Sequence, residues 1–188
     1  RRAPVFGSDE SYAGSVAGAV LGMSRGSRLY RRLVRERQLA TEAVAFTFDL
    51  AKGSDLLIVD ATARPEASGE ALERAVGECL DAMCEGGVGE DEVQRAIALI
   101  STDLVTSLQS AQSRADKLSQ FTTYFGDATL INTQMERYRR VTVDDVNRFV
   151  RERLVRENRA SLLYVPQDGG MGAVGGDAVV AATVQGEE

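Results

Sequence analysis

Two spacings of apolar residues alternate along this chain, and each spacing predicts a kind of element. Apolar residues three or four positions apart predict a helix over residues 10–22 and a second helix from Ser27 onward. Alternating apolar and polar residues over 43–50, followed after a short turn by the apolar run 56–63, predict a β-hairpin. The first third of the chain is therefore expected to form two helices and a hairpin.

The first predicted helix combines one apolar face with regularly spaced glycines. Gly14, Gly18 and Gly22 are four residues apart, and small residues at this spacing let another backbone come close. Each glycine costs about 1 kcal/mol relative to alanine, so packing must stabilise this helix. A phosphate-binding loop would need a Gly-Lys-Ser or Gly-Lys-Thr ending, which the sequence lacks here. The residues expected to be buried are Ala13, Val16, Ala17, Val20 and Leu21.

The first strand of the predicted hairpin has two unlike sides. Val44, Phe46, Phe48 and Leu50 fall on one side, because successive side chains of a strand point to opposite faces. Large apolar side chains are usually buried. We therefore predict that Phe46 and Phe48 face the helices and that the polar side of this strand faces a cleft.

Helical spacing returns after Pro65 and continues for most of the remaining chain. A long helix is expected to end at Gly86-Gly87, and another to open at Gly89–Asp91. Thr142 and Asp145 form a Thr-x-x-Asp capping box that predicts a last helix. A short apolar strand follows at 161–165. Helices, a hairpin, more helices and a strand, in this order, predict an α+β fold. We expect a two-layer sandwich, in which helices pack on one face of a mainly antiparallel sheet.

The 188 residues are enough for one sizeable core, so one domain is expected over residues 1–166, with a Gly- and Ala-rich, partly flexible tail over 167–188. In this tail Gly170, Gly172 and Gly175 fit the start of a dinucleotide-binding fingerprint. Only 13 residues follow Gly175, too few for the helix, strand and acidic residue that such a site requires. A linker is the simpler interpretation.

The formal net charge of −6 argues against a nucleic-acid partner, because proteins that bind polyanions carry basic faces. No run of 18 apolar residues is present, so no membrane span is predicted, and the first residues lack the apolar core of a secretion signal. The chain is expected to be soluble, with the cytoplasm favoured as its compartment.

The chain contains no histidine, which excludes Ser-His-Asp and Cys-His catalysis and the histidine-bearing zinc motifs within it. Its two cysteines, Cys79 and Cys84, have the spacing of neither a disulfide framework nor a zinc site. Cys79 is expected to be a small core residue. Residue chemistry alone therefore indicates an α+β domain that is not catalytic by itself.

The ordered series of motifs nevertheless resembles a known family. The stretch "SRLYRRLVRERQLA", an alternating hairpin, a "TARP" turn, a long helix, "GVGEDEVQRA" and the closing "VTVDDVNRFVRERLVRENRASLLYVP" are similar to the C-terminal half of the pitrilysin/insulinase zinc peptidases. This family of inverzincins includes the mitochondrial processing peptidases. The resemblance extends from about Ala3 to Pro166. The chain begins without Met and lacks the βαβ segment that precedes "RAP" in the family, so we expect it to be truncated on its N-terminal side.

The resemblance implies a non-catalytic half that encloses a peptide substrate opposite a homologous half carrying H-x-x-E-H and zinc. It implies no cofactor in this chain, with zinc in the partner half. It also implies two substrate contacts: Arg35 matches the family's arginine near the end of the second helix, and Thr41 or Glu42 stands where the family has a tyrosine. We select Arg35 and Thr41 as substrate-binding residues.

Two alternatives remain open from the sequence. Domains of this type also serve as catalytically inactive scaffold or interaction subunits, and an isolated copy could form a homodimer. Whether the parent protein is an active enzyme depends on a zinc-bearing half with which this chain is paired.

Overall fold

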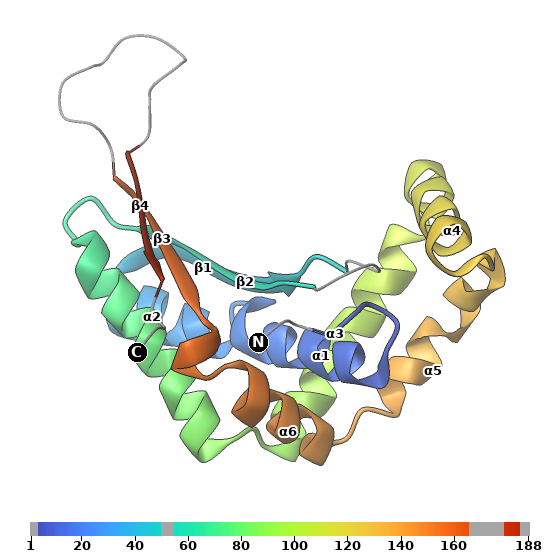
Figure 1. Cartoon of the computed structure of the whole chain (residues 1–188), viewed down its shortest axis with the longest axis horizontal. Coiled ribbons are helices and arrows are strands. Elements are labelled where there is room, and N and C mark those ends of the chain that lie inside the picture. The colour runs from blue at the N-terminus through green and yellow to red at the C-terminus, as the bar shows by residue number, and fades with distance from the viewer. Residues whose placement is uncertain (1–3, 50–54, 166–178, 185–188) are drawn as a thin grey trace, which may run out of the picture.

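The computed structural model describes residues 4–49, 55–165 and 179–184. An α+β fold is confirmed, with helices as the larger share and two antiparallel hairpins (Figure 1). In chain order the elements are α1 Asp9–Gly22, a π-helix η1 Tyr30–Glu36, β1 Ala40–Thr47, β2 Leu57–Ala63, α2 Gly69–Gly86, α3 Glu90–Ser107, α4 Ala111–Phe125, the 3₁₀-helix η2 Ala128–Thr133, α5 Gln134–Arg139, α6 Val143–Arg153, the 3₁₀-helix η3 Arg156–Asn158, β3 Ala160–Val165 and β4 Val179–Val184.

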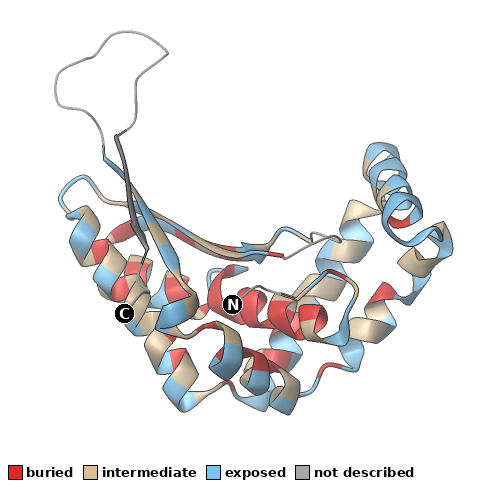
Figure 2. Cartoon of the chain, in the orientation of Figure 1, coloured by how far each residue is buried: buried red, intermediate tan, exposed pale blue. Residues whose placement is uncertain are grey.

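Helix α1 is the centre of the core, as its glycine-rich composition requires. It packs against β1, α3 and α6, and it is buried on nearly all sides (Figure 2). Ser8 caps its start, where the hydroxyl accepts from the backbone N–H of Ser11 at 3.3 Å. All five residues expected to be buried in this helix are buried. Because other elements cover its remaining sides as well, Tyr12 is also buried.

The later helices begin and end close to the expected positions. Gly87 follows α2 with a positive φ of 68°, which favours glycine at this helix end. The predicted Thr142–Asp145 capping box opens α6, with the Thr142 hydroxyl accepting from the Asp145 N–H at 3.2 Å. Local signals at helix ends therefore placed these elements correctly.

The orientation predicted for the first strand is wrong. The side of β1 that faces α1 carries Ala43 and Ala45, which are buried, whereas Phe46 and Phe48 are 43% and 52% exposed. The reason is the close approach of α1: a Cβ atom added to Gly22 would lie 2.0 Å from the backbone nitrogen of Ala45. Bulky side chains have no room between these backbones, so they lie on the opposite face.

The second hairpin pairs β3 with β4 in an antiparallel register from Ala160↔Val184 to Val165↔Val179. The strand expected at 161–165 is thus confirmed. No strand was expected at 179–184, within the Gly- and Ala-rich tail, and the structure forms one there. Gly170, Gly172 and Gly175, which were interpreted as part of a linker, lie outside the described residues.

The arrangement of the layers leaves one face of the β1–β2 hairpin uncovered. Helices α1, α3 and α6 lie on the other side of this hairpin, while α4 rises at one end of the molecule and β3–β4 at the other (Figure 1). The molecule is therefore concave, and the uncovered face of β1–β2 forms the floor of the concavity.

Candidate functional site

Arg35 lies in η1 and its side chain is exposed. Its neighbouring arginines in the same segment are engaged: Arg28 pairs with Glu92, Arg31 and Arg32 with Glu36, and Arg37 with Glu78. Arg35 takes part in no ion pair between described residues. It is thus the arginine of this helix that is available to an external carbonyl or carboxylate.

Thr41 lies where the pairing of β1 with β2 is irregular. Ala40 pairs with Ala63 and Glu42 with Thr62, so Thr41 is the extra residue of a β-bulge. Its hydroxyl donates to the carbonyl oxygen of Thr62 at 3.3 Å, and the residue is exposed. Bulges re-aim side chains and are common beside functional sites. No hydrogen bond between described residues joins Thr41 to Arg35, so the roles of the two residues stay predictions.

The uncovered face of the β1–β2 hairpin was not recognised from the sequence. Cross-strand pairs place its side chains in rows, with Phe46 opposite Ile58 and Val44 opposite Asp60. We define the hairpin face as the apolar residues Val44, Phe46, Phe48, Leu56 and Ile58. One sequence signal could have revealed this face. Ala43 and Ala45, which alternate with its large residues, are small enough to pack against a glycine-rich helix.

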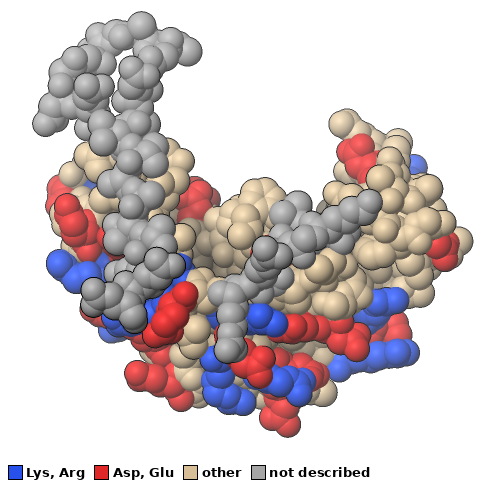
Figure 3. Space-filling model, viewed as in Figure 1, with Lys and Arg blue, Asp and Glu red and all other residues tan. Residues whose placement is uncertain are grey.

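The hairpin face is largely apolar and open. Phe46 and Phe48 meet edge to face with ring centroids 5.7 Å apart, and Leu56 is 53% exposed. In the space-filling view the molecule is hollowed between α4 and the β3–β4 end (Figure 3). Charged side chains gather on the helical side, whereas the described floor of the hollow is mostly uncharged. Contiguous exposed apolar surface of this kind marks interaction sites.

A polar cluster ties the end of the hairpin to the helices beneath it. The Thr47 hydroxyl donates to Asp49 at 3.1 Å and lies 3.2 Å from the Ser15 hydroxyl of α1. Burial raises the pKa of Asp49, although Lys117 of α4 opposes this shift. Burial also raises the pKa of Tyr138, which lies near Asp49. The cluster fixes the hairpin against α1 and α5.

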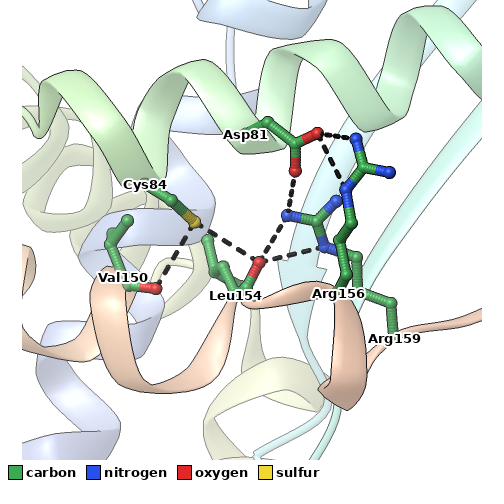
Figure 4. Close-up of polar contacts among 6 residues, drawn as sticks. All are labelled: Asp81, Cys84, Val150, Leu154, Arg156 and Arg159. Carbon is green, nitrogen blue, oxygen red and sulfur yellow. Dashed lines mark hydrogen bonds and ion pairs between the residues drawn. The ribbon is translucent and has the colours of Figure 1, made fainter. Parts of the chain in front are cut away.

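The two cysteines have structural roles. The Cys84 thiol donates to the carbonyl oxygen of Leu154 at 3.4 Å, and the Arg159 guanidinium donates to the same oxygen at 2.9 Å (Figure 4). Asp81 of α2 bridges Arg159 and Arg156 (Figure 4). Hydrogen bonding to Arg156 is the main reason that the pKa of Asp81 is lowered. This network fastens α2 to the end of α6 and the start of β3.

The thiols are poor candidates for nucleophiles. Burial raises the pKa of both Cys79 and Cys84, which favours the unreactive thiol form at neutral pH. Cys79 is half-buried against the core. Within the described part of the chain, no group of three or more Cys, Asp or Glu side chains is placed to hold a metal ion. The described helices also include none that is long and apolar enough to cross a membrane.

Comparison with solved structures shows the same fold in several proteins. The inactive peptidase domain of a protein assigned as a zinc protease in Bordetella parapertussis superposes with a TM-score of 0.72 at 24% identity, and the match covers 84% of each chain. A protease from Helicobacter pylori superposes with a TM-score of 0.70 at 21% identity, over 80% of this chain and 36% of its own.

The chain is also similar in sequence to longer proteins. An uncharacterized zinc protease of Mycobacterium tuberculosis is 29% identical over 162 residues, which make up 86% of this chain and 36% of the relative. Another, from Streptomyces coelicolor, is 26% identical over 155 residues, or 82% and 33%. The chain thus spans about a third of the length of these relatives. The family model described as the peptidase M16 inactive domain matches residues 3–100, just over half of the chain. This chain therefore belongs to the peptidase M16 inactive-domain family.

Proposed function

We propose that this domain encloses and helps to bind a peptide substrate opposite a zinc-bearing half of a metallopeptidase. The observation that carries the proposal is the hollow itself, whose floor presents an exposed apolar strand pair in a domain of the M16 family (Figure 3). A peptide confined between two such shells is oriented and partly desolvated, which accelerates its hydrolysis.

Zinc belongs to the partner half in this proposal. The chain has no histidine, and its described carboxylates and thiols form no cluster of three, so its residues do not fit a zinc site. The partner half, in the same polypeptide or a separate subunit, would carry H-x-x-E-H and supply a zinc-activated water.

The contribution of this chain to catalysis is substrate positioning. The guanidinium of Arg35 makes no ion pair with the residues that the structure describes, and it would donate to a carbonyl or carboxylate oxygen of the peptide. Thr41 lies at a bulge on the adjoining strand, and its hydroxyl, which donates to Thr62, can still accept a hydrogen bond from a peptide N–H. Interactions of this kind with the reacting segment hold it at the correct distance from a catalytic centre on the other half.

The proposal is tested by combining this domain with a zinc-bearing half and measuring peptide cleavage with and without a chelator. We expect cleavage that requires both halves and stops when the chelator is added. Arg35→Ala should lower kcat/KM about tenfold or more through loss of a charge-assisted hydrogen bond worth about 1.5–3 kcal/mol. Arg31→Ala is the matched control, because Arg31 lies on the same helix and already pairs with Glu36.

The scaffold alternative gives a different result in the same experiment. Stable assembly of the two halves without cleavage of a broad peptide set would favour an interaction subunit. Equal loss of activity in the Arg31 and Arg35 variants would remove the assignment of Arg35 as a substrate contact.

A further inference from the structure

The hairpin face has the geometry of a site for side chains of an extended chain. Val44, Phe46 and Phe48 project from the same side of the strand region at every second residue, about 7 Å apart. An extended peptide lying along the hairpin repeats its side chains at the same interval. Its apolar side chains can therefore contact this row in register.

One end of the hairpin face is acidic. Asp60 is the cross-strand partner of Val44, and Glu42 lies on the same side next to it. Both side chains are exposed, and neither takes part in an ion pair between described residues. A bound chain that contacts Phe46 thus meets the carboxylate of Asp60 about one side-chain repeat further along and that of Glu42 one repeat beyond it.

The size of the hairpin face favours a peptide over a second copy of this chain. Only Phe46, Phe48 and Leu56 are about half exposed and Val44 and Ile58 less so, whereas each partner in a stable protein–protein interface buries about 800 Å². The face also lies on the floor of the hollow between α4 and the β3–β4 end (Figure 3). A narrow extended chain reaches such a floor more readily than a broad protein surface.

We infer that the hairpin face is a specificity site that accepts an apolar, preferably aromatic, side chain over Phe46 and Ile58 and favours a basic over an acidic side chain two residues away, beside Asp60 and Glu42. This inference rests on the proposed function and adds to it the class of peptide preferred. Phe46 and Ile58 contact the apolar side chain, and the carboxylates act by charge complementarity.

Binding to the whole chain tests the inference without any need for catalysis. The probes are fluorescently labelled decapeptides of Gly, Ser and Thr with a central Phe-Thr-Arg, Ala-Thr-Arg or Phe-Thr-Glu segment, and the readout is fluorescence anisotropy. We expect the Phe-Thr-Arg peptide to bind about tenfold more tightly than the Ala-Thr-Arg peptide, because burial of a phenyl ring provides at least that factor. The Phe-Thr-Glu peptide should bind more weakly, with a difference that shrinks as salt is added.

Variants assign the preference to named residues. Phe46→Ser and, separately, Ile58→Ser should reduce the Phe-over-Ala preference to about one, and Asp60→Asn with Glu42→Gln should abolish the Arg-over-Glu preference. Tyr164→Ser is the control, since Tyr164 is an aromatic residue of the other hairpin with 64% exposure. Circular dichroism confirms that each variant folds.

Three outcomes would overturn the inference. The first two are no Phe-over-Ala preference in the native chain, and a preference that Phe46→Ser and Ile58→Ser leave unchanged. The third is self-association of the native chain, measured by sedimentation, that is lost in Phe46→Ser, because the face would then be an interface between copies. These outcomes are separate from a failure of the proposed function. Cleavage by the two combined halves without a preference set by Phe46 would contradict this inference alone, whereas the preference without cleavage would contradict the peptidase role alone.

Discussion

The two faces of the β1–β2 hairpin reverse the usual distribution of side-chain size. The face toward α1 carries Ala43 and Ala45, with 1% and 5% exposure, whereas Phe46 and Phe48 on the opposite face are 43% and 52% exposed. Burial of the large side chains would have removed more apolar surface from water. The fold instead uses the buried side for a close contact between two backbones.

This difference shows that small side chains on the covered face permit a close contact between the backbones of β1 and α1, whereas large side chains on the open face are available to a binding partner. Glycines of α1 allow the helix to lie against β1, which presents the small side chains of Ala43 and Ala45 to it. Exposed aromatic side chains are costly to keep in water and invite association. Their retention on the concave side agrees with a role in binding.

The largest expected effect comes from disturbing the covered face. In Gly22→Ala the new Cβ would lie 2.0 Å from the Ala45 nitrogen and 2.5 Å from the carbonyl carbon of Val44, both backbone atoms. The strand or the helix must therefore shift. We expect the free energy of unfolding to fall by about 4 kcal/mol, measured by urea denaturation.

Gly18→Ala provides the matched control one helical turn earlier. A Cβ atom there would be 3.8 Å from the Leu57 side chain and 3.9 Å from the Phe46 Cα, which are ordinary contact distances. Because alanine favours helix over glycine by about 1 kcal/mol, this variant should be neutral or more stable. Equal destabilisation by both substitutions would disprove the close-contact explanation.

A smaller effect is expected at Asp49, where a carboxyl group lies on the covered side at the end of β1. Burial raises its pKa, with Lys117 opposing and Asp55 reinforcing the shift. A raised pKa means that the folded state binds the proton more readily than the unfolded state. Stability is therefore fully present below the ordinary Asp pKa of about 3.9 and decreases as the pH rises through the folded-state value.

Asp49→Asn should remove this loss, because an amide stays neutral and can still accept from the Thr47 hydroxyl. Asparagine also tolerates the positive φ of 58° at this position. We expect the variant to be more stable by about 1 kcal/mol at pH 7 and to equal the native chain near pH 3. Urea denaturation at several pH values measures the difference. A gain that does not change with pH would point to a cause other than ionisation.

Local signals in the sequence were sufficient for most elements, but not for strand β4 or for the orientation of β1. Periodicity and capping placed α1, α2 and α6, and alternation followed by an apolar run placed β1 and β2, because these features depend on residues close together in the chain. The rule that large apolar residues face inward failed at Phe46 and Phe48. The sequence contained the correction, since Gly18 and Gly22 already indicated a close backbone contact, but the partner of that contact was not identifiable from spacing.

Prediction of the candidate site from the sequence was limited still more by contacts between residues far apart in the chain. Arg35 differs from Arg28 and Arg37, which pair with Glu92 and Glu78, residues 64 and 41 positions away in the chain. No local pattern distinguishes one arginine of this helix from another. The resemblance selected Arg35, and the structure adds a physical reason for that choice without testing its role.

The smallest expected effect on stability comes from a substitution on the open face of the hairpin, and this substitution is the sharpest test of what that face is for. Phe46 contacts Phe48 at the surface, and 43% of it is exposed, so Phe46→Ser should change the free energy of unfolding by about 1 kcal/mol or less, as judged by urea denaturation. Ala45→Leu, one residue earlier and on the covered face, should cost about 1–3 kcal/mol because it overpacks the contact with α1. A large loss in Phe46→Ser would mean that the ring supports the fold. A small loss would mean that the fold does not need the exposed ring, as expected if its role is to contact the proposed peptide.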